Sequence, residues 1–195
     1  MPRWFKILLV LVILVGMPLF AWYFLNKGTQ MRKEAMALLL PKETISSFQS
    51  VTDTDKVYYS DSLFGKRWLI AILGADETRK KSAEIIENLY KQTSIDFELN
   101  VFTISGLFFG EKMSEISQKL HWPSSNKNWI NTFMAQDHVY PFANSIFIIP
   151  EKYQNKPCVV LLDENSKVRN YYNLTVESDV RSLVRHLPVF LSLKN

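Results

Sequence analysis

The sequence predicts an α/β domain with a mixed β-sheet, preceded by one N-terminal transmembrane helix. Three observations predict it: an apolar run from Ile7 to Leu25, a strand-like run from Trp68 to Leu73 that is apolar on both faces and leads into an amphipathic helix, and two late strands joined by a short polar turn before a closing helix. With 195 residues, of which 47% are hydrophobic and 22% charged, the chain can bury one core of ordinary size. We therefore expect one domain after the membrane segment.

The run from Ile7 to Leu25 contains no charged residue. At about 1.5 Å rise per residue it is long enough to cross a bilayer as a helix. A cleaved signal peptide is the alternative, but the run exceeds a secretory apolar core and no small-x-small cleavage site follows. We predict a single-pass anchor over residues 1–27, in which Gly16 and Pro18 let the helix bend or pack against a neighbour. The domain is expected on the extracytoplasmic side, in the periplasm or intermembrane space.

Residues 28–55 are predicted to form a juxtamembrane stalk, with a short helix over 31–40 that ends before Pro41. Residues 56–195 are predicted to form the domain. Its central strand, helix and next strand form a right-handed crossover, so the two strands should be parallel. In chain order the predicted elements are strands over 68–73 and 97–105 with a helix between them, helices over 112–120 and 129–135, strands over 145–149, 157–163 and 168–172, and a helix over 175–191.

Charge and cysteine content exclude several functions. The 23 basic and 19 acidic side chains give a net charge of only +4. This charge does not indicate a nucleic-acid-binding surface. Cys158 is the one cysteine, so an internal disulfide, a CxxC pair and a thiolate zinc site are excluded. It falls in a predicted core strand, where a thiol is expected to be buried and unreactive. No glycine-rich loop follows the central strand, and the sequence predicts no cofactor.

Two histidines of the irregular middle region are weak candidates for a metal site. His121 and His138, with Asp137 or a methionine such as Met113 or Met134, could form a copper or zinc site, because imidazole is the commonest metal ligand and thioethers bind Cu(I). No HxH, HxxxH or MxxM spacing supports the grouping. His186, in the last helix, is expected to be structural.

Three segments resemble the Sco/SenC family of membrane-anchored copper chaperones for cytochrome oxidase. They are Leu63 to Trp68, which leads into the central strand, Val159 to Tyr172, which forms the late hairpin, and the closing helix through Leu187. The resemblance implies a thioredoxin-like fold for the predicted order of elements.

The sequence departs from that family at the metal ligands. The family's CxxxC motif falls at Glu77 and Lys81, and its distal histidine falls near Asn155 or Lys156. A Cu(I) site requires thiolates, thioethers or imidazoles, which these residues do not provide. In their own right, Glu77 and Lys81 are spaced for an ion pair in the first turn of a helix.

The resemblance implies a non-catalytic accessory or assembly factor of a respiratory membrane complex, cytochrome oxidase by family analogy, that acts by protein–protein contact. Two alternatives remain open: a stably bound structural subunit of a larger membrane complex, and a copper carrier or thiol-independent enzyme that uses His121 and His138. The aromatic-rich insert over about 106–143 fits either ordinary core packing or an exposed contact patch.

Overall fold

The computed structural model describes Trp4 and residues 10–193. The chain divides into two units, Met1–Leu38 and Leu39–Asn195. The second unit thus begins inside the range 28–55 that the sequence assigned to a stalk. The domain is longer at its amino end than expected, because part of that range joins the sheet.

The first unit is helical. A π-helical turn, η1 (Val12–Gly16), leads into α2 (Met17–Leu38), so the predicted helix over 31–40 is the end of a longer one. Gly16 closes the π-helical turn, and Pro18 lies in the first turn of α2. In the part of the chain that the structure describes, no helix combines the length and the apolar character needed to cross a membrane. The predicted transmembrane helix is therefore not found there, and its first residues, 7–9, lie outside the described residues.

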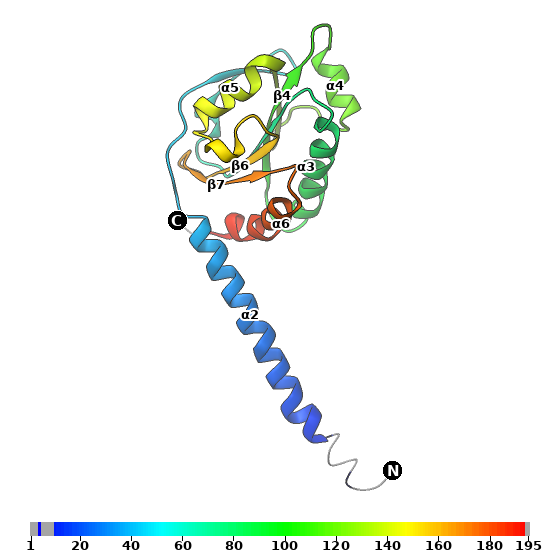
Figure 1. The fold of residues 1–195 in the computed structure, drawn as a ribbon, viewed down its shortest axis with the longest axis vertical. Coiled ribbons are helices and arrows are strands. Elements are labelled where there is room, and N and C mark those ends of the chain that lie inside the picture. Colours follow the sequence, from blue (N-terminus) through cyan, green and yellow to red (C-terminus); the bar gives the residue numbers. More distant parts are fainter. Residues whose placement is uncertain (1–3, 5–9, 194–195) are drawn as a thin grey trace. The chain divides into compact units, whose positions relative to one another are not determined.

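The second unit, over residues 39–193, contains a seven-stranded mixed sheet in the order β2-β1-β5-β4-β3-β6-β7 (Figure 1). The strands are β1 (Gln49–Thr52), β2 (Val57–Tyr59), β3 (Trp68–Leu73), β4 (Asn100–Leu107), β5 (Trp129–Ala135), β6 (Cys158–Leu162) and β7 (Val168–Asn173). The helices are η2 (Ser60–Leu63), α3 (Arg79–Thr93), α4 (Met113–Lys119), α5 (Gln136–Ile146), η3 (Glu151–Tyr153) and α6 (Glu177–Ser192).

The central strand β3 separates two hydrophobic cores because its side chains alternate between the faces of the sheet. Leu69, Ala71 and Leu73 face the core that contains α3 and α6, whereas Ile70 and Ile72 face the core that contains α5. Figure 1 shows α5 on one side of the sheet and α3 and α6 on the other. The strand is buried along its whole length, which is why its sequence is apolar at every position.

The strand pairings confirm that the two strands joined by the first helix of the domain are parallel. β3 and β4 are parallel, with Trp68 beside Asn100 and Leu73 beside Ser105. β4 and β5 are also parallel, whereas β6 runs antiparallel to β3 and to β7. The carboxyl ends of β3, β4 and β5 therefore meet at one edge of the sheet.

Two predicted elements are wrong. The range 129–135 is not a helix but strand β5, which pairs with β4 on one side and with β1 on the other. The range 145–149 is not a strand: α5 ends at Ile146, and the chain then turns through Ile148, whose φ is +51°. Both runs are short and apolar, and burial against neighbours decides the state of such runs.

Each outer strand of the sheet has a feature that limits the number of its free backbone hydrogen-bonding groups. β2 has 3 residues. The start of β7 is covered by residues 42–45: Lys42 N–H donates to Val168 O at 2.8 Å, Val168 N–H donates to Glu43 O at 2.9 Å, and Thr44 forms an isolated antiparallel bridge with Lys167.

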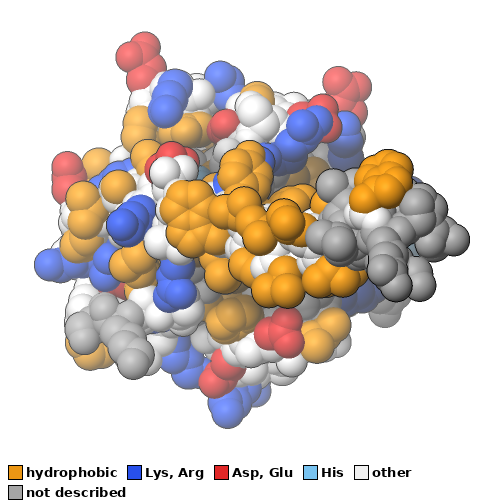
Figure 2. Space-filling view, turned by 90° about the horizontal axis from the view of Figure 1, so that it is seen from below, with side chains coloured by type: hydrophobic (Ala, Val, Ile, Leu, Met, Phe, Trp, Pro, Cys, Tyr) orange, Lys and Arg blue, Asp and Glu red, His pale blue; other side chains and the backbone are white. Residues whose placement is uncertain are grey.

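Charged side chains are mixed on the face seen in Figure 2. Lys and Arg side chains and a few Asp and Glu side chains are scattered there around a broad area of hydrophobic side chains.

Candidate functional site

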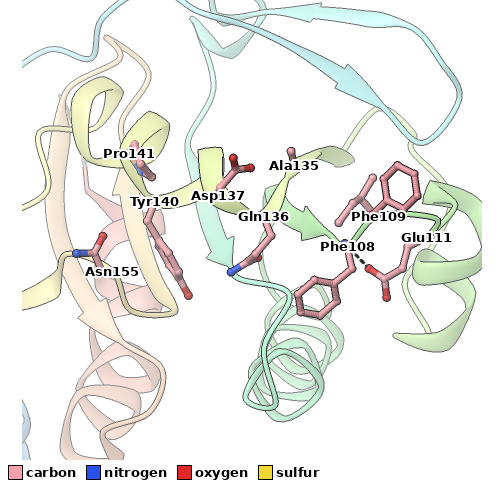
Figure 3. A pocket seen from close by; sticks show the side chains of 10 residues that line it. Phe108, Phe109, Glu111, Ala135, Gln136, Asp137, Tyr140, Pro141 and Asn155 are labelled. Carbon is pink, nitrogen blue, oxygen red and sulfur yellow. Dashed lines mark hydrogen bonds between the residues drawn. The ribbon is translucent and has the colours of Figure 1, made fainter.

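A cleft of about 850 Å³ lies where the carboxyl ends of β4 and β5 meet α5. This edge of an open α/β sheet is the usual place for ligands and chemistry. Figure 3 shows Asn155 at one end of the cleft and Phe108, Phe109 and Glu111 at the other, with Tyr140 and Gln136 between them.

The end of β3, beside this cleft, is filled by two side chains from α5. Gln136 Oε1 accepts a hydrogen bond from Ala75 N–H. The Tyr140 hydroxyl accepts one from Gly74 N–H at 3.2 Å and donates one to Asp76 Oδ2 at 3.3 Å. Gln136 and Tyr140 thus satisfy the backbone N–H groups of Ala75 and Gly74, which follow the central strand. Together with Asp76 they are here called the strand-end cluster. Burial and the neighbouring Asp76 carboxylate raise the pKa of Tyr140, so its phenol stays protonated.

Two glycines make room for the strand-end cluster. A Cβ on Gly106 would lie 2.0 Å from Gln136 Oε1 and 2.8 Å from Ala75 N. A Cβ on Gly74 would lie 2.7 Å from the Tyr140 hydroxyl. The close approach of α5 to the ends of β3 and β4 therefore depends on both positions lacking a side chain.

The residues at the Sco-like motif positions lie near this edge but do not form a site. Glu77 is exposed in the turn before α3, and Lys81 is exposed in the first turns of α3. The expected ion pair between them is absent from the ion pairs of the described residues. Asn155 borders the cleft, and Lys156 Nζ donates instead to Lys152 O.

Cys158 is the first residue of β6 and lies beside Ile72 of β3. It is buried, and this burial raises the pKa of its thiol to about 12. A thiol in this setting is not a nucleophile near neutral pH, because the thiolate is the reactive form.

The predicted metal candidates are dispersed among the described residues. His121 is exposed just after α4, with a φ of +57°. His138 is exposed in α5, with its Nε2 3.6 Å from Asp137 Oδ2, and it shares a small pocket with Met134 but not with His121. No group of three or more His, Cys, Asp or Glu side chains in the described part is placed to hold a metal ion.

His186 has a different environment. Its Nδ1 lies 2.9 Å from the Tyr172 hydroxyl, and burial together with nearby Arg185 lowers its pKa. The imidazole therefore favours its neutral form and links α6 to β7.

The aromatic-rich insert contributes to both core and surface. Trp122, Trp129 and Phe133 are buried, whereas Phe108 and Phe109 are exposed at the rim of the cleft. These two residues, with Gly110 at a φ of +86°, are here called the aromatic tip. The insert is therefore divided between residues that pack in the core and residues that are exposed.

An arginine holds the aromatic tip in place. Arg79 forms a two-point ion pair with Glu111, with N–O distances of 3.0 and 3.3 Å, and donates to Gly106 O at 2.9 Å. Glu111 also accepts from Phe108 N–H at 2.9 Å. The hydrogen bonds from Arg79 lower the pKa of Glu111, which therefore remains ionised at neutral pH.

Sequence reasoning missed Gln136 and Tyr140. Neither residue type nor local spacing identifies a side chain that fills a strand end more than sixty residues away. The signal that was present is a glycine at the end of each of two predicted strands, Gly74 and Gly106, since glycine there often marks close approach of another group.

Comparison with known proteins shows the fold. No family model matches the sequence, and no curated protein matches it. Among solved structures, BsSco, a member of the Sco family of cytochrome c oxidase assembly proteins, is 18% identical with a TM-score of 0.60, covering 80% of this chain and 98% of its own. A putative protein disulfide isomerase from Bacteroides thetaiotaomicron is 16% identical with a TM-score of 0.60, covering 80% and 92%.

A SCO1/SenC family lipoprotein from Bacillus anthracis is 16% identical with a TM-score of 0.57, covering 74% of this chain and 93% of its own. The two Sco proteins and the putative isomerase have the thioredoxin-like fold in common. The domain of this chain is therefore a thioredoxin-like α/β fold, similar in structure to both Sco/SenC proteins and thiol-disulfide oxidoreductases.

Proposed function

We propose that this chain is a non-catalytic accessory or assembly factor of a respiratory membrane complex, and that it acts by protein–protein contact through the aromatic tip and the adjoining cleft. The observation that carries the proposal is the strand-end cluster. Side chains of α5 occupy the hydrogen-bonding groups that follow the central strand, and the one thiol is buried in β6. This edge of the sheet therefore offers a surface for contact with another protein rather than a reactive group.

The contact surface is held in shape before any partner arrives. Phe108 is about half exposed and Phe109 is fully exposed, yet the loop that carries them is fixed by Arg79 and Glu111. Exposed aromatic side chains in a fixed loop are typical anchors of protein interfaces, because little conformational entropy is lost on binding.

The respiratory part of the proposal rests on the structural likeness to Sco proteins, one of which is described as belonging to a family of cytochrome c oxidase assembly proteins. The membrane part rests on the apolar run from Ile7 to Leu25. In its described portion the large apolar side chains from Val10 to Leu25 are exposed, as they would be in contact with lipid.

The test is affinity purification of the full chain from gently solubilised native membranes, with co-eluting proteins quantified by mass spectrometry and metal measured in the same eluate. We expect respiratory-complex subunits to co-elute with the wild type. With the double variant Phe108→Ser/Phe109→Ser, we expect the recovery of these subunits to fall at least about tenfold, because the interface loses an aromatic hot spot.

The matched control is Ile95→Ser, which removes another exposed apolar side chain, in the turn after α3. Equal recovery with both variants would overturn the tip as the contact surface. Absence of respiratory subunits from the wild-type eluate would overturn the partner class. About one copper ion per chain would favour the carrier alternative.

A further inference from the structure

Two adjoining hollows lie between the segment that leads into β1, the chain from the end of β2 through η2, and the turn between β6 and β7. Their volumes are about 470 and 420 Å³, and Ser47, Ser60 and Asp61 line both of them. They are here called the paired hollows. They share no lining residue with the cleft beside the aromatic tip, so a ligand bound there would not occupy the proposed contact surface.

Hydrogen bonds fix the three segments that form the paired hollows. Ile45 N–H donates to Ser166 O at 3.0 Å, which joins the first segment to the turn between β6 and β7. Ser60 N–H donates to Phe48 O at 3.0 Å, and Phe48 N–H donates to Ser60 Oγ at 3.1 Å, which joins the first segment to the second. The walls are thus held without a ligand, and binding would cost little ordering of the chain.

Each hollow contains one exposed aromatic ring. Phe64 lines the larger hollow and is 66% exposed, and Tyr59 lines the smaller hollow and is 52% exposed. Among the described residues of the domain, the aromatic tip supplies the only other exposed aromatic side chains. An aromatic ring exposed in a hollow presents an apolar face against which a ligand can pack.

The other exposed side chains that line the paired hollows are all polar. Among the described residues, none of them forms a side-chain hydrogen bond or an ion pair within the chain. They are Thr44, Ser46, Ser47, Gln49, Asp61 and Asn165. Their hydroxyl, carboxamide and carboxylate groups can therefore both be reached by a ligand and bond to it.

This combination of groups selects one class of ligand. An anion would meet the Asp61 carboxylate, and no basic side chain among the described lining residues offsets it. A hydrocarbon would cover the polar groups without bonding to them. An ammonium group is best held by several rings around one point, whereas here the two rings lie in different hollows. A sugar ring has a C–H face that packs on an aromatic ring, and its hydroxyls both donate and accept hydrogen bonds.

We propose that the paired hollows bind a neutral saccharide of at least two linked sugar rings. One ring packs on Phe64 and the next on Tyr59, while Asp61, which lines both hollows, accepts hydrogen bonds from sugar hydroxyls. Each volume falls within the range of small-molecule sites. The proposal goes beyond the accessory function and depends neither on the aromatic tip nor on a respiratory partner.

The experiment uses the full chain in a detergent without a sugar headgroup, labelled with 4-fluorophenylalanine. The ¹⁹F signal of Phe64, assigned with Phe64→Ser, reports occupancy of the larger hollow. The probes are cellobiose, maltose and N,N′-diacetylchitobiose. Sorbitol is the control that has hydroxyls but no ring, and tetramethylammonium is the cationic competitor. We expect a saturable shift with at least one disaccharide and none with sorbitol, because sorbitol has no rigid C–H face.

Saturation-transfer difference spectra of the bound disaccharide measure its affinity for each variant. Phe64→Ser and Asp61→Asn should each weaken binding at least about fivefold, because one loses the packed ring and the other a charge-assisted hydrogen bond. The Tm should be unchanged, since both side chains are exposed. The matched controls Ile95→Ser and Asp96→Asn change exposed residues in the turn after α3 and should bind like the wild type.

Four results would overturn the proposal. They are no saturable Phe64 shift with any of the three disaccharides, an equal shift with sorbitol, unchanged affinity in either Phe64→Ser or Asp61→Asn, and tighter binding of tetramethylammonium than of every disaccharide. The last result would assign the hollows to an organic cation.

Discussion

Two arginine–glutamate pairs of similar burial lie at opposite ends of the sheet. Arg67, just before β3, pairs with Glu164 at 2.9 and 3.2 Å. It also donates to the carbonyl oxygens of three residues at the end of α6, which are Phe190, Leu191 and Leu193. Arg79, just after β3, pairs with Glu111 and donates to a single carbonyl oxygen, that of Gly106.

The difference lies in what each pair holds. The last carbonyl groups of a helix have no partner within the helix, and Arg67 supplies donors for three of them at once. It therefore closes a packed end of the domain. Arg79 holds a loop whose side chains, Phe108 and Phe109, are exposed. Similar ion pairs thus serve stability at one end and the shape of a surface at the other.

The largest effect is expected for Arg67→Met. The change removes the two-point pair with Glu164 and the donor of three carbonyl groups at the end of α6. A partly buried ion pair and three hydrogen bonds, each contributing about 0.5–1.5 kcal/mol, together predict a loss of about 3 kcal/mol or more in the free energy of unfolding. Urea denaturation followed by circular dichroism measures it. Arg181→Met, which breaks the exposed pair with Glu177, is the control and should cost less than about 1 kcal/mol. Equal losses would refute the special role of Arg67.

Next in size is Gly106→Ala, which tests the end of the sheet that holds the cleft. The new methyl group would overlap Gln136 Oε1 and the backbone nitrogen of Ala75, and the backbone atom cannot move aside cheaply. We expect a loss of about 1–3 kcal/mol, as for other overpacked sites. Gly28→Ala, where nothing lies within 4 Å, should not destabilise the chain. An unaffected Gly106→Ala protein would mean that the strand-end cluster is loosely packed.

Arg79→Met should cost less stability than Arg67→Met, about 1–2 kcal/mol, because only one carbonyl oxygen loses its donor. Its main effect should be local. Hydrogen exchange measured by mass spectrometry is expected to speed up over 106–111 while the protection of β3 is unchanged. If exchange in the loop stays slow, other contacts hold the aromatic tip and the contrast between the two pairs disappears.

The smallest effect is the acid dependence that both pairs share. Hydrogen bonds from arginine lower the folded-state pKa values of Glu111 and Glu164 below the ordinary 4.5. A lowered carboxyl pKa contributes stability that is complete above the unfolded value and is lost as the pH falls through the folded value. The free energy of unfolding should therefore decline below about pH 4.5, and less steeply in Arg67→Met and Arg79→Met. If the free energy of unfolding declines with the same slope in the wild type and in both variants, other groups cause the acid sensitivity.

The sequence predicted the centre of the fold better than its flanks. The strand over 68–73 has the bounds expected, because burial on both faces leaves an unbroken apolar run. The range 129–135 was misassigned because its strand state depends on pairing with β4 and β1, which a local pattern does not record. The strands β1 and β2 were missed for the same reason, since each is short and pairs with a distant or equally short partner.

The composition of the candidate site was not predicted. The family resemblance singles out Glu77, in the turn after β3, and Lys81, in the first turns of α3, and both are exposed. The groups that fill the strand end, Gln136 and Tyr140, arrive from α5 on the other side of the sheet. Their position follows from the packing of that helix, which itself was only partly predicted.

The short segment over residues 42–45 beside β7 has a consequence for solubility. An uncovered outer strand is a template on which another chain can add and start a fibril. Here the hydrogen-bonding groups of Val168 are already used by Lys42 and Glu43, and the opposite outer strand, β2, is only 3 residues long. The start of β7 and the short β2 therefore offer little backbone for growth, which limits one route to aggregation.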